Sequence, residues 1–275
     1  MVELWSQPVL WISFVFYFLL SNLCQVVADL YMPPSFIQPP PTLWQQFQRW
    51  LVGPLAEIIH DLGLCKKVAA EEEKLSEKEL SKRHEVVQAW ITSFVHALLT
   101  TVFGLWIFFV VQAEEERNYV FLLMHTCGYF LADTIVNPSI MFALHHLCPF
   151  PFLWVLMAHD ASLRNACMSL VFAEAGNAVS HGATLLTCKT GLPFQVIRAA
   201  SFWLSRPPSM YFAYQAFVHD VPEIYHGTWV GHGCFTMVFI VAFINLGWML
   251  AMLLPPAARY KVSSWCNRTS TVKLD

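Results

Sequence analysis

The sequence predicts an all-α protein, a polytopic membrane helical bundle with about seven transmembrane helices. Its composition is the first reason, because 56% of the 275 residues are hydrophobic and only 13% are charged, whereas soluble domains carry about 25% charged residues. The second reason is the distribution of charge, since 12 of the 35 charged residues fall within residues 66–85. The rest of the chain holds too few charges to face water, so lipid is its expected solvent.

Composition also excludes several other classes of protein. The net charge of −3 provides no basic surface, so no nucleic-acid partner is expected. The eight cysteines form no Cys-x-x-Cys pair, which argues against a zinc module or a disulfide scaffold. The 22 Phe and 11 Trp residues exclude a disordered chain. No metal and no resident cofactor is expected.

The N-terminal part of the chain is predicted to contain one span and two further helices. A span needs about 20 apolar residues, and residues 5–27 supply them without a preceding Lys or Arg, so this run is not a signal peptide. After a Pro-rich connector at residues 33–41, residues 43–64 place aromatic side chains beside Gln and Arg, which is typical of an interfacial helix. Residues 66–85 hold six acids and six bases, which predicts a solvated helix.

Six more spans are predicted in the remainder of the chain. Pro138 should kink the third span, Pro207-Pro208 should break or kink the sixth, and Pro255-Pro256 should end the last. The fourth span is short, and it becomes long enough only if it starts before Pro149. The six predicted spans are residues 86–111, 119–144, 144–158, 165–186, 194–218 and 229–254.

Loop charges predict the orientation of these spans. With the N-terminus outside, the inside loops hold 12 Lys and Arg residues and the outside loops hold 2, which favours an N-out, C-in arrangement. The expected membrane is that of the endoplasmic reticulum, with the mitochondrial inner membrane or another organelle as alternatives. The predicted domains are an N-terminal helix (1–30), a connector with the amphipathic and charged segments (31–85), a membrane domain (86–255) and a polar tail (256–275).

Ionisable side chains within spans are the first candidates for a functional site, because they are costly at membrane depth unless paired or hydrated. Glu174, Asn177 and His181 are spaced i, i+3 and i+7, so they share one face of a helix. This face predicts a polar lining inside the bundle. The alternative is that the three side chains hold neighbouring helices together by hydrogen bonds.

Histidines form the second group of candidates. The pair His145-His146 follows the third span, where a neutral imidazole can act as a base or a hydrogen-bond partner. A metal site would need three or four converging ligands, and adjacent helical residues point about 100° apart. The pairs His159-Asp160 and His219-Asp220 are expected in solvated loops, as an alternative to a cation site. Weaker polar stripes in the second and third spans comprise Ser93, His96, Thr100, His125, Tyr129, Asp133 and Asn137.

Several short motifs follow one another along the predicted membrane domain. They are Trp90, Ser93 and His96, then Gly128 to Asp133 with the sequence GYFLAD, the pair His145-His146, and then Glu174, Arg206, Asn245 and Trp248. In this order the motifs resemble the TLC-domain family, which includes the ceramide synthases, over about residues 83–255. The resemblance implies a six-helix membrane domain and an additional N-terminal span.

The segment after the paired histidines departs from the ceramide-synthase pattern. Ceramide synthases carry two Asp residues before a Leu-Glu there, whereas residues 147–166 read LCPFPFLWVLMAHDASLRNA with a single Asp. His181 also stands where many other relatives have Asn. The chain therefore resembles the branch of the family that does not make ceramide.

The sequence thus predicts a protein that binds or modifies a membrane lipid in an intramembrane cavity. If it catalyses a reaction, acyl transfer from a thioester such as acyl-CoA is expected, with His145 or His146 as base and Asp133 orienting it. The alternative is a non-catalytic accessory subunit of a larger membrane complex. The side chains expected to line the lipid site are Glu174, Asn177, His181, His96, Tyr129 and Arg206.

Overall fold

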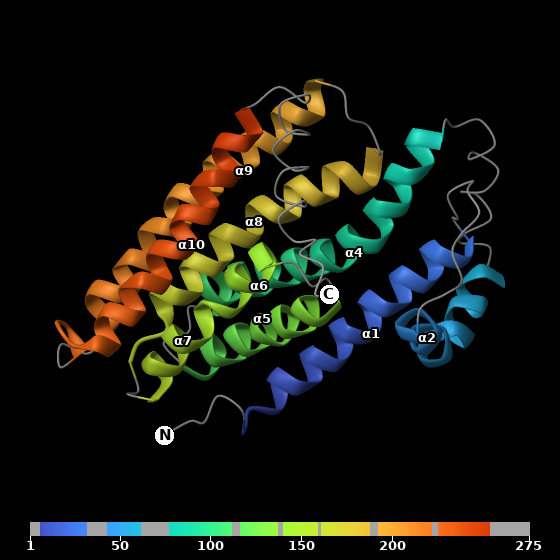
Figure 1. The fold of residues 1–275 in the computed structure, drawn as a ribbon. Helices are drawn as coiled ribbons and strands as arrows, with labels where there is room; N and C mark the ends of the chain where they lie inside the picture. The colour runs from blue at the N-terminus through green and yellow to red at the C-terminus, as the bar shows by residue number, and fades with distance from the viewer. Residues whose placement is uncertain are drawn as a thin grey trace, which may run out of the picture.

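The computed structural model describes residues 6–31, 43–61, 77–111, 116–136, 140–158, 161–187, 192–221 and 225–253. All regular structure in these ranges is helical, which confirms the all-α prediction for them (Figure 1). The elements are α1 (Pro8–Tyr31), α2 (Leu43–Asp61), α4 (Glu77–Leu105), the π-helical segment η2 (Trp106–Val111), α5 (Glu116–Val136), α6 (Ile140–Leu147), α7 (Pro149–Ala158), α8 (Arg164–Thr187), α9 (Leu192–Gln215), the π-helical segment η3 (Ala216–Asp220) and α10 (Trp229–Leu253).

Four of these helices are long and apolar enough to cross a membrane. Their apolar windows are Pro8–Ala28, Ile91–Val110, Arg117–Val136 and Trp229–Leu250. The described helices α8 and α9 are as long as α1 but less apolar, because α8 carries the predicted polar face and α9 carries two arginines and three prolines. The chain therefore has the composition of a polytopic membrane protein.

Several predicted features lie outside the described residues. Among them are the Pro-rich connector, residues 66–76 of the charged segment, Pro138, His159-Asp160, Pro255-Pro256 and the polar tail. The described part of the charged segment belongs to α4, which starts at Glu77 and continues into the second predicted span. The amphipathic segment forms α2, where Trp50 is 75% exposed.

The third predicted span covers α5 and the first part of α6, and the fourth covers the end of α6 and all of α7. The helix α5 ends at Val136 and α6 begins at Ile140, and the predicted kink at Pro138 falls between them, outside the described residues. A turn at Cys148 then separates α6 from α7. Pro149 accounts for this turn, because proline lacks an amide N–H and fits the first position of a new helix. Most of α7 is buried, so it serves as a core element.

The helix α9 continues through Pro207 and Pro208, so the predicted break is wrong. Proline is tolerated inside such a helix when neighbouring groups hold it in place. Here α8 packs along α9, and the hydroxyl oxygens of Ser169 and Ser209 are 3.3 Å apart. Gly176 brings the two backbones close, because an added Cβ would lie 2.9 Å from the Ser201 carbonyl oxygen.

The bundle is built around α5, in which every residue from 122 to 130 is buried. Helices α1 and α2 flank it on one side, and α9 and α10 lie on the other (Figure 1). Gly128 permits the close packing of α1, because an added Cβ would lie 2.6 Å from the Leu10 carbonyl oxygen. In the same seam, His125 lies within hydrogen-bond distance of the Ser13 and Tyr17 hydroxyls, at 3.1 and 2.9 Å.

Candidate functional site

A buried polar network connects α4, α8 and α9 through Glu174. Its Oε1 lies 3.7 Å from His96 Nε2, and its Oε2 accepts a hydrogen bond of 3.0 Å from Asn177 Nδ2. Arg206 Nη2 in turn donates to Asn177 Oδ1 at 2.6 Å. Glu174 and Arg206 are only 6% and 1% exposed. Four of the six side chains predicted to line a lipid site are therefore joined into one network.

The His96 ring is fixed on several sides. It stacks on Tyr129 with the ring centroids 4.0 Å apart and the planes 12° from parallel. Its Nδ1 lies 3.4 Å from the Thr100 hydroxyl, while Nε2 faces Glu174. The Tyr129 hydroxyl is 2.8 Å from Ser93 Oγ. These contacts tie α4 to α5 and place Tyr129, a fifth predicted residue, against the network.

Asp133 lies beside His146, the second histidine of the pair. Its Oδ2 is 3.3 Å from His146 Nδ1, and both side chains are buried. The His146 ring also stacks on Phe130, with a centroid distance of 4.6 Å and an angle of 7°. The sequence left open whether Asp133 would contact His145 or His146, and in the structure it contacts His146. The contact joins the short helix α6 to the central helix α5.

His145 has a different environment from its neighbour. Its ring lies edge-on to Trp248 of α10, with the centroids 4.9 Å apart. The side chain is half-buried, and its Nδ1 is a buried atom with no hydrogen-bond partner among the described residues. His145 also lines a cavity, whereas His146 is absent from that lining.

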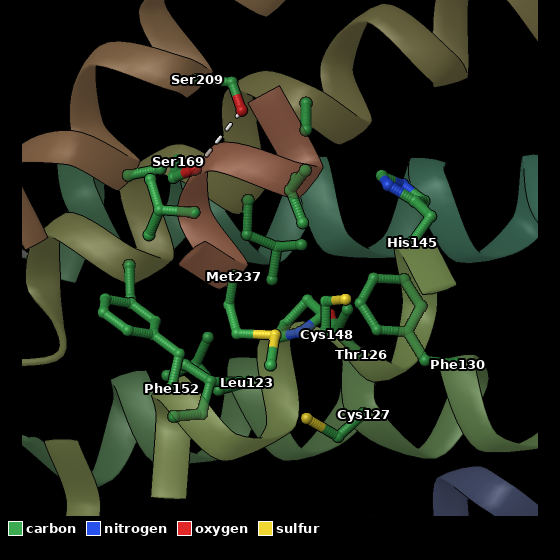
Figure 2. Close-up of a pocket in the computed structure, with 18 of the residues that line it drawn as sticks. Leu123, Thr126, Cys127, Phe130, His145, Cys148, Phe152, Ser169, Ser209 and Met237 are labelled. Atoms are coloured by element: carbon green, nitrogen blue, oxygen red, sulfur yellow. Dashed lines mark hydrogen bonds between the residues drawn. The ribbon is translucent and has the colours of Figure 1, made fainter. Parts of the chain in front are cut away.

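This cavity of about 120 Å³ lies where α5, α7, α8, α9 and α10 converge near His145 (Figure 2). Its wall is mostly apolar, with Phe152 and Met237 among the side chains that face each other across it. In the view of Figure 2, His145 lies at one side and the hydrogen-bonded Ser169 and Ser209 lie toward the other. The polar residues in the lining are Thr126, His145, Ser169, Glu174, Ser209 and Asn245.

The structure separates the residues predicted for the site into three groups: those that line the cavity, those in the network behind Glu174, and those in neither place. Glu174 and His145 line the cavity. His96, Asn177 and Arg206 lie behind Glu174 in the network, and Tyr129 stacks on His96. Three further predicted residues line no part of the described cavity: His146, Asp133 and His181, the last half-buried on α8.

Four polar residues of the cavity were missed as lining residues by the sequence analysis: Thr126, Ser169, Ser209 and Asn245. Thr126 gives little signal in an apolar helix, because threonine commonly bonds its own helix backbone. Asn245 was noted only as a motif landmark, since nothing in the sequence indicates which helix it faces. Thr126 and Asn245 are nevertheless buried beside the cavity.

The prediction of a loop is wrong for His219-Asp220, because this pair ends the π-helical segment η3. Asn165 Nδ2 donates to both carboxylate oxygens of Asp220, at 3.3 and 3.0 Å, which connects η3 to α8. His226 and His232 are exposed. Within the ranges that the structure describes, no three His, Cys, Asp or Glu side chains come together in a way that could hold a metal ion.

The chain was compared with known proteins, and no family model, curated protein or solved structure matches it. Its function must therefore be inferred from the chemistry of its own residues.

Proposed function

We propose that this chain is a membrane protein that binds a lipid in the cavity between α5, α7, α8, α9 and α10. The observation that carries the proposal is the cavity itself, with a mostly apolar wall and a few polar side chains such as Glu174 and His145. Binding sites for small amphiphilic molecules have this composition, because apolar surface provides affinity and a few polar groups fix orientation.

The helices around the cavity support a lipid as the ligand. Helices α5 and α10 each contain a stretch long and apolar enough to cross a membrane, and both contribute to the cavity wall. A ligand that enters between such helices comes from the bilayer. A cavity of about 150 Å³ holds a molecule the size of benzene, so about 120 Å³ suits a lipid head group and its first carbons.

The same proposal includes a TLC-like membrane domain with seven spans in total, oriented N-out and C-in, in the endoplasmic reticulum. The proximity of His96, Tyr129, Glu174 and Arg206 supports it, because motifs far apart in the sequence meet in one network. Tags placed at both ends of the chain, tested for protease access in sealed vesicles, check the orientation. An external C-terminus would contradict it.

Acyl transfer from a thioester such as acyl-CoA is an extension of this proposal. His145 is the better placed base, because it lines the cavity and its Nδ1 has no hydrogen-bond partner among the described residues. Asp133 contacts His146, so it would not orient that base. Turnover that is lost in His145→Gln but retained in Asp133→Asn would support this assignment, and the opposite result would contradict it.

A specific observation favours the second candidate function, an accessory subunit of a larger membrane complex. Glu174, Asn177 and Arg206 close most of the network by hydrogen-bonding to one another, although Arg206 Nε finds no partner among the described residues. A scaffold needs such closure, because buried polar groups must find partners without a ligand. This candidate predicts stable co-purification with other membrane subunits and no lipid held in the cavity.

Mass spectrometry of the gently purified protein distinguishes the two candidates. We expect one retained lipid per chain in the wild type. Ala173→Phe should lower its occupancy, because Ala173 lines the cavity and the larger ring would fill it. The matched control is Val179→Phe on the same helix, at an exposed position outside the lining. A stoichiometric complex without bound lipid, or equal occupancy in both variants, would contradict lipid binding.

A further inference from the structure

Three polar groups beside the cavity have no hydrogen-bond partner among the described residues. They are the Asn245 Oδ1, the Thr126 Oγ1 and the His145 Nδ1. Asn245 and Thr126 are only 3% and 2% exposed. Buried polar atoms are normally paired, because leaving them unpaired costs free energy. A ligand in the cavity would gain affinity by pairing them.

The hydrogen bonding of Asn245 determines what kind of group it requires. Its Nδ2 donates to the Val241 carbonyl oxygen at 2.9 Å. A backbone carbonyl can only accept, so this bond assigns the amide nitrogen and leaves the acceptor Oδ1 unpaired. The ligand atom that pairs with Asn245 must therefore be a hydrogen-bond donor. The Thr126 hydroxyl can then donate to an acceptor on the same ligand.

Charges around the cavity select against an ionised head group. Glu174 contributes a carboxylate to the lining, and no Lys or Arg is among the lining residues that the structure describes. The nearby Arg206 donates to Asn177. A phosphate or carboxylate would thus be buried near the Glu174 carboxylate with no cation in the cavity wall to pair with, which is unfavourable. An ammonium head would need a carboxylate, but both oxygens of Glu174 already face His96 and Asn177.

We propose that the ligand is a single-chain lipid whose head is an uncharged hydroxyl group. The hydroxyl donates to Asn245 Oδ1 and accepts from the Thr126 hydroxyl, while the first carbons of the chain contact Phe152, Leu153 and Met237. A head with one chain attached fits a cavity of about 120 Å³ better than a head with two, because only the head and its first carbons enter it. This inference rests on the proposed lipid-binding function and specifies its ligand class.

The test uses the full chain in nanodiscs and three probes that carry the same photoreactive group on the same alkyl chain. They are analogues of dodecanol, of its methyl ether and of dodecanoate. The ether cannot donate a hydrogen bond, so the wild type should label with dodecanol about tenfold more than with the ether. In Asn245→Leu and Thr126→Val this ratio should fall toward one. Thr92→Val is the matched control, because Thr92 is equally buried on α4 but lies outside the cavity lining.

The outcomes separate this inference from the proposed function. Equal labelling by dodecanol and its ether, with both reduced in Ala173→Phe, would overturn the hydroxyl head but retain lipid binding. Stronger labelling by dodecanoate would also overturn the hydroxyl head. Labelling that is absent, or that is unaffected by Ala173→Phe, would overturn both. If Asn245→Leu does not fold, Thr126→Val alone still tests the inference through its dodecanol-to-ether ratio.

Discussion

Two buried polar regions meet at Glu174, and they differ in whether side chains or an open volume lie beside their polar atoms. On one side, Glu174 contacts His96 and Asn177, and Asn177 accepts from Arg206. On the cavity side, Asn245 Oδ1 and His145 Nδ1 find no partner among the described residues. In the network, His96 Nε2 and Arg206 Nε also have no hydrogen-bond partner among the described residues, but neither residue lines the cavity. The same helix, α8, contributes to both regions.

The contrast indicates different roles for the two regions. Paired polar groups hold helices in a fixed register, and removing one partner leaves the other buried and unsatisfied. Unpaired groups beside an open volume gain their partner from a ligand. We therefore expect substitutions in the network of His96, Glu174, Asn177 and Arg206 to lower stability. Substitutions in the cavity should change ligand binding.

The largest loss of stability is expected for Arg206→Leu. Arg206 is fully buried, and its loss leaves Asn177 Oδ1 unpaired and the carboxylate of Glu174 without a nearby cation. Leaving a buried charge without its counter-charge costs about 3–5 kcal/mol. Thermal unfolding in detergent, followed by circular dichroism, measures the change. The control Arg164→Gln, at an exposed helix start, should stay within about 0.5 kcal/mol. Equal stability of the two variants would contradict the account of the network.

A smaller loss is expected at Glu174, and it should depend on the substitute. Glu174→Leu leaves the Asn177 amide without its acceptor, at about 1.5–3 kcal/mol for a lost hydrogen bond to a charged group. Glu174→Gln keeps an acceptor oxygen and should be tolerated for folding. Comparing the unfolding temperatures of the two variants tests this order, and a fully tolerated leucine would show that the network is dispensable.

The smallest expected loss of stability concerns helix packing at two glycines, Gly128 on α5 and Gly247 on α10. Gly128→Ala should cost about 1–3 kcal/mol, because the new methyl group meets the backbone of α1 at Leu10 and Phe14. Gly247→Ala on α10 meets no atom within 4 Å and should stabilise its helix by about 0.5–1 kcal/mol. A lower unfolding temperature for Gly128→Ala and a higher one for Gly247→Ala would support this difference in packing. Destabilisation of similar size at both positions would contradict it.

Helical periodicity accounts for what the sequence could predict of the network. Glu174 and Asn177 are three residues apart on α8, so their contact follows from helix geometry. Their partners His96 and Arg206 lie on other helices, and a single sequence carries no direct signal for which helices pack together. The start of α7 at Pro149 could be predicted from the sequence, because proline fits the first position of a helix.

The cavity was the least predictable feature of the chain. Its volume arises from the packing of five helices, and no local pattern encodes such a space. Thr126 and Asn245 became candidates only when their burial and unpaired atoms were visible. The family resemblance identified Asn245 as a landmark without indicating what it contacts.

Thermal unfolding before and after delipidation tests the central claim most directly. A ligand at 100 times its Kd stabilises a protein by about 2.7 kcal/mol, so the wild type should lose stability on delipidation and recover it with added dodecanol. Arg206→Leu should be less stable than the wild type both with and without lipid. Ala173→Phe, which fills the cavity, should show no recovery with dodecanol. A full recovery in Ala173→Phe would contradict the account, because the lipid would then bind elsewhere.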